Sequence, residues 1–229
     1  MWRAYSARRT GTALNGTEKA ENTRKCMIMT QAMADIARSA LQQGRAVISD
    51  ETAKRPATIL CCSPVVADVW ISGRLGFVLL LHRRHDGLVG EELYYSLRSE
   101  DGVWDRPDHL SGSIVGWDTP AVEDALAGAS MSVVADSESL IYTGRAPNAD
   151  DGERVKIYEL LISSNAELIE IECFSPASPT PAFISREVTG PLMLLVLLPG
   201  ERMRVHTARR EKSSLRRLGG VLDLHNVEQ

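Results

Sequence analysis

Two histidines and an aspartate lie within a five-residue segment, at His82, His85 and Asp86. Imidazole nitrogens and carboxylate oxygens are ligands for divalent metals, so this segment is a candidate metal site. Side chains three residues apart on a strand point to opposite faces, so the three groups converge only if the strand ends by Arg83. The positive charges of Arg83 and Arg84 would also repel a cation. A solvated strand end is the simpler alternative.

Arginines in the same region offer a second chemistry. Arg83 and Arg84, together with Arg74, could hold an anionic ligand, because guanidinium groups bind phosphate and carboxylate in bidentate fashion. The alternative is that Arg83 and Arg84 pair with Glu91 or Glu92 across a hairpin. The sequence contains neither of the common glycine-rich nucleotide-binding motifs, so we do not expect a nucleotide.

A further polar cluster consists of Asp105, Asp108 and His109, grouped around Pro107 in a segment that has the composition of a loop. Loops often carry catalytic or binding groups, so an enzyme could use this cluster or the cluster around His82. An aspartate-rich segment with a proline is also typical of an ordinary turn. No G-x-S-x-G nucleophile motif and no C-x-x-C pair is present in the sequence.

The carboxylates of Glu170 and Glu172 alternate with apolar residues, and Glu159 on the preceding segment could join them. A catalytic carboxylate pair needs a cleft in which one pKa is raised. An exposed strand face, with charges that discourage pairing with other strands, explains the same residues more simply.

The aromatic residues suggest a possible partner surface. Trp104 and Trp117, with Tyr94, would mark such a surface if the three rings are exposed together. The alternative is that these rings are buried anchors of the core.

The elements that carry these residues follow a β-rich pattern. The chain has 229 residues, of which 44% are hydrophobic and 24% charged, enough for a sizeable core. Apolar spacing behind Thr30 predicts a helix over about 31–43, and Thr119-Pro120 predicts a short helix over about 120–127. Short apolar runs between turn residues predict strands over 46–49, 57–62, 65–72, 76–82, 92–98, 103–104, 131–135, 139–143, 155–162, 168–174, 192–198 and 201–206. The fold class we predict is mainly β: an antiparallel β-sandwich or a strongly curved sheet.

Two strand pairings can be predicted from the pattern. The runs 155–162 and 168–174 flank a short polar turn, which favours a hairpin. The buried run 192–198 ends at Pro199-Gly200, and we expect 201–206 to return beside it. Residues 105–118 are expected to be a loop.

Charge is distributed unevenly along the chain, whose formal net charge is −4. Residues 1–27 hold six Lys/Arg against two Glu, and residues 201–217 hold seven against two, whereas 28–200 hold 13 basic and 24 acidic residues. We therefore expect a disordered basic leader (1–28), a single β-rich domain (29–206) and a basic, partly disordered tail (207–229). An acidic domain repels phosphate backbones, which disfavours nucleic acid as a partner.

These observations favour a non-enzymatic β-rich module that binds a protein partner or assembles with itself. The alternative is an enzyme or a metal- or anion-binding protein that uses one of the polar clusters. We expect no cofactor, a cytoplasmic location and no membrane span, because the longest apolar run, Leu192 to Leu198, is far shorter than the roughly 20 residues that a span needs.

Overall fold

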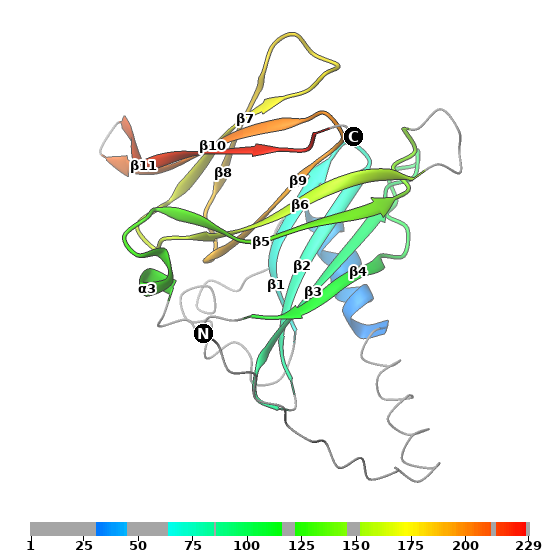
Figure 1. Ribbon diagram of the computed structural model, residues 1–229. Helices are drawn as coiled ribbons and strands as arrows, with labels where there is room; N and C mark the ends of the chain where they lie inside the picture. Colours follow the sequence, from blue (N-terminus) through cyan, green and yellow to red (C-terminus); the bar gives the residue numbers. More distant parts are fainter. Residues whose placement is uncertain are drawn as a thin grey trace, which may run out of the picture.

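The computed structural model describes residues 31–44, 64–84, 86–115, 122–145, 152–211 and 214–227. Within these residues the fold is mainly β, with three antiparallel sheets and two helices, which confirms the predicted fold class (Figure 1). One helix covers residues 31–43, as predicted, and the short helix α3 is Val122–Leu126. The predicted leader (1–28) and the predicted strands 46–49 and 57–62 lie outside the described residues.

The first sheet is a meander in the order β1-β2-β3-β4. Its strands are β1 (Val65–Ser72), β2 (Leu75–Arg83), β3 (Val89–Leu97) and β4 (Asp108–Ile114). One face packs against the helix 31–43, where Ala37 and Leu41 share a core cluster with Val78 and Tyr94. The opposite face joins the main core through Phe77, among others.

The second and third sheets have the orders β5-β6-β9 and β11-β10-β7-β8. Their strands are β5 (Met131–Ile141), β6 (Glu153–Ile162), β9 (Leu192–Leu197), β7 (Leu168–Phe174), β8 (Ala182–Glu187), β10 (Arg202–Glu211) and β11 (Ser214–His225). Successive strand side chains point to opposite faces. Ile157 and Leu160 of β6 are both fully buried, so this strand has protein on both faces.

The predicted hairpin between 155–162 and 168–174 is wrong, although both strands exist. β6 pairs with β5 and β9, whereas β7 pairs with β10 and β8 in a different sheet. The physical reason is that β5 and β9 occupy both edges of β6, so no edge of this strand is left for β7. Ile169 and Ile171 of β7 therefore share the core with β6 from an adjoining layer instead of extending its sheet. β10 likewise does not return beside β9 but pairs with β7 and β11.

Two expectations about loops and tails are also corrected. The segment predicted as a loop over 105–118 contains β4, and the expected tail contains the end of β10 and all of β11. Asn226 fixes the end of β11 by donating from its side-chain amide to the carbonyls of Arg154 and Leu197. The predicted strands 131–135 and 139–143 are one continuous strand, β5.

A buried ion pair joins all three sheets. Asp68 lies at a bulge of β1, and its carboxylate accepts a hydrogen bond from the backbone N–H of Leu194 in β9 at 2.7 Å. Arg186 of β8 donates to the other oxygen of Asp68 at 2.5 Å, and its guanidinium lies 5.3 Å from the Trp70 ring centroid. Burial raises the pKa of Asp68, while Arg186 and the Leu194 N–H oppose that rise.

Candidate functional site

The structure unites one histidine from each of the two predicted polar clusters. His82 of β2 and His109 of β4 both hydrogen-bond through Nε2 to the carboxylate of Glu92, which lies on β3 between them. The distances are 3.1 Å from His82 to Glu92 Oε1 and 2.6 Å from His109 to Glu92 Oε2. His82 is buried, whereas the His109 side chain is 41% exposed. We call these three residues the His–Glu–His cluster.

A β-bulge places His109 in this cluster. Glu92 lies opposite Gly112 and Tyr94 lies opposite His109, so Leu110 is an extra residue in β4. Without it, His109 would point to the other face of the sheet, away from Glu92. The bulge also brings the His109 ring against Tyr94, with centroids 5.2 Å apart.

Two glycines leave room for the cluster. A Cβ atom on Gly90 would lie 2.6 Å from Nε2 of His82, and one on Gly112 would overlap the Glu92 carboxylate. Both glycines lie inside strands, where glycine is unfavourable. The arrangement of imidazoles and carboxylate on this sheet therefore depends on the absence of a side chain at one position on each of two neighbouring strands.

The chemistry of the cluster follows from its hydrogen bonds. An ionised Glu92 accepts from Nε2–H of both rings, so in the neutral imidazoles Nδ1 is left as the acceptor. A carboxylate that fixes a histidine tautomer in this way prepares the other nitrogen to accept a proton or a hydrogen bond. Because the His109 side chain is 41% exposed and His82 is buried, His109 is the ring of the two that a ligand can reach.

The remaining members of the predicted metal and loop clusters lie elsewhere. Asp86 pairs with Arg84 at 3.3 Å and accepts the Leu88 N–H, while His85 lies outside the described residues. Asp108 neighbours His109 along β4 and lies opposite Tyr95. Asp105 contributes only backbone hydrogen bonds to the described structure. Among the described residues, no group of three or more His, Cys, Asp or Glu side chains is arranged to hold a metal.

The three arginines predicted to bind an anion do not converge. Arg74 lies in the β1–β2 turn and donates to the carbonyl of Arg98, whereas Arg83 and Arg84 lie at the other end of β2. Arg83 donates to the carbonyl of Gly87.

The aromatic residues predicted to form a partner surface do not form one in the described structure. Tyr94 and Trp104 are buried in the cluster beneath the helix 31–43, and Trp117 lies outside the described residues. The reason is that the helix covers this face of the first sheet.

The predicted acidic strand face is neutralised by arginines. Glu170 accepts from Arg217 at 2.8 Å, and Glu172 lies 3.8 Å from Arg204. Glu159 does not join them, because it lies on β6 in the second sheet.

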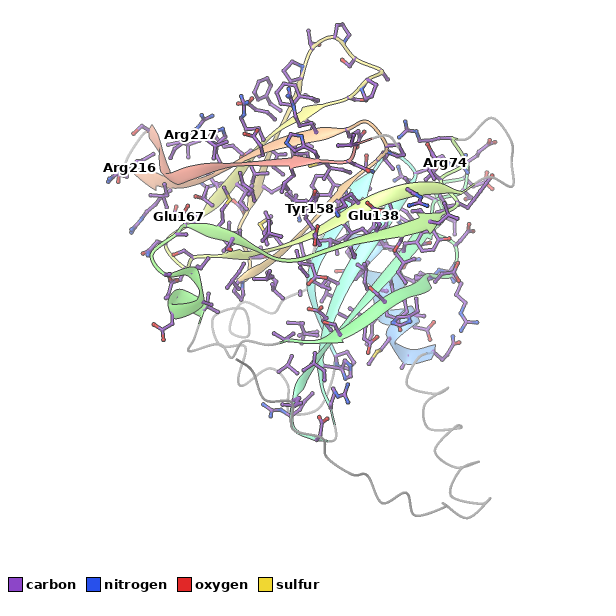
Figure 2. The ribbon with its side chains drawn as sticks, viewed as in Figure 1. Arg74, Glu138, Tyr158, Glu167, Arg216 and Arg217 are labelled. Carbon is purple, nitrogen blue, oxygen red and sulfur yellow. The ribbon has the colours of Figure 1, made fainter. Side chains whose placement is uncertain are left out.

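The basic C-terminal strands supply those arginines. Figure 2 shows Arg216 and Arg217 on β11 at the opposite side of the molecule from Arg74. Five of the six described arginines of β10 and β11 have a carboxylate partner, the pairs being Arg204–Glu172, Arg204–Asp223, Arg209–Glu167, Arg210–Glu187, Arg216–Glu211 and Arg217–Glu170. The sixth is Arg202.

An aromatic–arginine surface surrounds Arg202 on the outer face of the third sheet. The Arg202 guanidinium lies 4.3 Å from the ring centroid of Phe174, and Arg204 lies 6.0 Å from the same ring. Phe183 is on the neighbouring strand β8, opposite Glu172, and its side chain is 73% exposed. We call Phe174, Phe183, Arg202 and Arg204 the Phe–Arg surface. Sequence reasoning missed it because β8 was not predicted.

The chain matches no protein-family model, no curated protein and no solved structure. No helix in the described residues has the length and apolar character that a membrane span requires.

Proposed function

We propose that this chain is a non-catalytic protein-interaction module that binds its partner through the Phe–Arg surface. The single observation that carries the proposal is that exposed Phe183 shares the outer face of the third sheet with Arg202, which among the described residues has no carboxylate partner. Aromatic residues and arginine are the types enriched at the centres of protein interfaces. An arginine stacked on a phenylalanine also keeps its hydrogen-bonding edge available.

The surface indicates the chemistry of the partner. Every other described arginine of β10 and β11 has a carboxylate within 4 Å, so Arg202 is the position at which a partner can supply one. Phe183 would pack against an apolar side chain next to that carboxylate. The expected partner is therefore a protein segment that offers an acidic residue beside an apolar residue.

Two of the open sheet edges are poorly suited to pairing with a strand of another chain. The edge strands β5 and β11 each contain a bulge, and β5 carries charged residues such as Asp136 and Glu138. Bulges and charges of this kind discourage edge-to-edge pairing. The edge strand β8, which carries Phe183, pairs with β7 without a bulge and is mostly exposed, so a self-assembling form of the protein would pair through β8.

The test is a selection from a random displayed-peptide library against the immobilised full chain. We expect selected peptides to carry Asp or Glu next to an apolar residue, and we expect Arg202→Gln to abolish their enrichment. Light scattering of the same sample distinguishes a monomer from a self-assembled form. Peptides without an acidic residue, or enrichment that survives both Arg202→Gln and Phe183→Ser, would contradict the proposal.

A second candidate function is supported by the His–Glu–His cluster. His109 is 41% exposed, and if its Nε2–H donates to Glu92, its Nδ1 would act as a general base toward a hydroxyl or water. We expect His109→Gln to lower the hydrolysis rate of p-nitrophenyl acetate if this site is catalytic. The matched control is His225→Gln, which removes another exposed histidine. Equal rates for the two variants would argue against catalysis at His109.

A further inference from the structure

Six strands end the three sheets, and five of them are poorly suited to pairing with another chain. β1, β4, β5 and β11 each contain a register shift, and β9 is buried along its whole length. The remaining end strand is β8, which pairs with β7 in an unbroken register. Five of its six residues are exposed. Among the described residues, β8 is therefore the one edge strand that is both regular and exposed.

The charged residues of β8 do not protect this edge. Bulges, prolines and charged side chains are the usual devices that keep an edge strand from pairing. β8 contains no proline and no lysine, and both of its charges are balanced inside the chain. Arg186 is paired with Asp68 at 2.5 Å, and Glu187 is paired with Arg210 at 2.9 Å. A strand added to β8 would therefore meet no uncompensated charge on it.

A hydrogen bond just beyond β8 shows which of its backbone groups face the open edge. The Val188 N–H donates to the carbonyl of Glu167, which precedes β7. In an antiparallel sheet, successive residues direct both of their backbone groups alternately to one side and the other. Counting back from Val188, the N–H and C=O groups of Phe183, Ser185 and Glu187 therefore face away from β7. These groups are the ones that an added strand would bind.

We propose that a second copy of this chain pairs antiparallel with β8, about a two-fold axis between the two copies of Ser185. In this register Ser185 lies opposite Ser185 of the second copy, and Phe183 lies opposite Glu187 of the second copy. Each outward-facing residue then exchanges both of its backbone hydrogen bonds with the residue opposite, so the third sheets of the two copies become one continuous sheet. The pairing goes beyond the proposed partner site, because it does not require Arg202.

The side chains of β8 complement one another in this register, which favours a second copy as the occupant. On the outer face, the exposed ring of Phe183 meets Glu187 of the second copy, whose charge is balanced by Arg210. On the other face, Ile184 lies opposite Arg186 of the second copy. A shift of two residues in one direction would place the two copies of Arg186 opposite each other, and like charges so placed are destabilising. A shift in the other direction would leave Glu187 without a counterpart in β8.

Cysteine cross-linking tests the register. Ser185→Cys should form a covalent dimer under mild oxidation, above the background given by the wild-type chain, which has four cysteines. Facing hydrogen-bonded residues have Cα atoms about 5.5 Å apart, a separation that a disulfide can bridge. The two copies of Glu187 would lie roughly 14 Å apart, so Glu187→Cys should stay at the background. Equal cross-linking of the two variants, or none above the background for Ser185→Cys, would overturn this register.

Light scattering over a series of protein concentrations tests the pairing itself. The mass of the wild-type chain should rise with concentration from that of one chain toward that of two. Ser185→Pro removes a backbone N–H that faces the open edge and none that faces β7, and proline is tolerated at such edge positions. We expect it to raise the dimer dissociation constant by about tenfold or more, because each dimer loses two hydrogen bonds. The control Ser185→Ala keeps the N–H and should dimerise like wild type.

Two outcomes would overturn the pairing: a wild-type chain that stays monomeric at every concentration, or a Ser185→Pro chain that dimerises as tightly as wild type. If Ser185→Pro does not fold, Ser185→Lys replaces it under the same criterion, because it places two ammonium groups directly opposite each other without changing the backbone. Arg202→Gln should dimerise like wild type while losing the selected peptides. Failure of the pairing and failure of the proposed partner site are therefore distinguishable.

Discussion

At the scale of single residues, the His–Glu–His cluster forms because two glycines leave space for its side chains. It does not form because the two histidines are close in the sequence. His82 and His109 are 27 positions apart, and each was predicted within a separate polar cluster. The residue that unites them, Glu92, was considered only as an arginine partner. The alternation of residue types along β4 does not reveal the bulge at Leu110. The bulge changes the face of the sheet on which His109 lies, but it does not change the composition of the strand.

The glycine requirement gives the first prediction. Gly112→Ala should displace the Glu92 carboxylate and destabilise the protein by about 1 kcal/mol, the net value of the histidine hydrogen bonds that the movement disturbs. Denaturant unfolding measures this change. The control is Gly220→Ala, where an added Cβ meets nothing within 4 Å and a change within about 0.5 kcal/mol is expected. Equal effects of the two substitutions would show that the Glu92 carboxylate does not need the space left by the missing Cβ of Gly112.

The buried pair of Asp68 and Arg186 gives the second prediction. Asp68→Asn removes the charge that balances Arg186 in the interior, and such a loss typically costs about 3–5 kcal/mol. The exposed pair of Glu138 and Arg154, separated by 3.6 Å, is the control, and Glu138→Gln should cost no more than about 1 kcal/mol. A mild effect of Asp68→Asn in chemical denaturation would mean that the three sheets do not depend on this pair.

At the scale of elements, the chain must be held where it crosses from β6 to β7. The Glu123 carboxylate of α3 accepts hydrogen bonds from the Ser164 N–H and hydroxyl at 2.8 Å and from the Ser163 hydroxyl. The Ser164 N–H is the main reason that the pKa of Glu123 is lowered. A short helix therefore fixes the crossover that replaces the hairpin expected from the sequence.

This contact gives the third prediction. Glu123→Ala should destabilise the protein at neutral pH by about 1 kcal/mol, the net value of a lost hydrogen-bonded group. Because folding lowers the pKa of Glu123, its contribution is present above the unfolded value of 4.5 and is lost as the pH falls through the folded value. The deficit relative to wild type should therefore shrink in acid. Asp124→Ala on the same helix is the control, and a deficit that does not depend on pH would contradict this account.

Most elements could be predicted because their patterns are local. The strands β1 and β7 have the predicted bounds, and the helix 31–43 follows its apolar stripe. The pairing of β6 could not be predicted in this way. A strand that is buried on both faces has the same composition whether its next strand continues the sheet or covers it. β8 was missed because it follows a proline-rich loop and is largely exposed.

At the scale of the whole molecule, charge that is segregated along the sequence is paired in space. The basic C-terminal strands meet the glutamates of β7, β8 and the adjoining turn, so five of their six described arginines are already neutralised. We expect this surface to bind a phosphate backbone weakly, because such binding depends on unpaired cations. This pairing could not be deduced from net charge, because it depends on the order of strands in the third sheet.

The fourth prediction concerns β11, which the sequence pattern suggested was a tail. A chain that ends after Glu211 loses every pair that β10 makes with β11 and both side-chain hydrogen bonds of Asn226. We expect this shortened chain to lose cooperative unfolding, as followed by tryptophan fluorescence in denaturant. Asn226→Ala in the full chain should remain folded and lose about 1–3 kcal/mol, the cost of buried carbonyls left without their donor. A cooperative transition in the shortened chain would restore the tail interpretation.

Partner binding at the Phe–Arg surface is tested by a binding titration with Phe183→Ser. A peptide selected on the wild-type chain is titrated against wild type, Phe183→Ser and Leu140→Ser. The control is closely matched, because Leu140 on β5 is 71% exposed and Phe183 is 73% exposed. We expect at least about tenfold weaker binding for Phe183→Ser, equivalent to about 1.4 kcal/mol, with Leu140→Ser unchanged. Equal affinity for Phe183→Ser and wild type would contradict it.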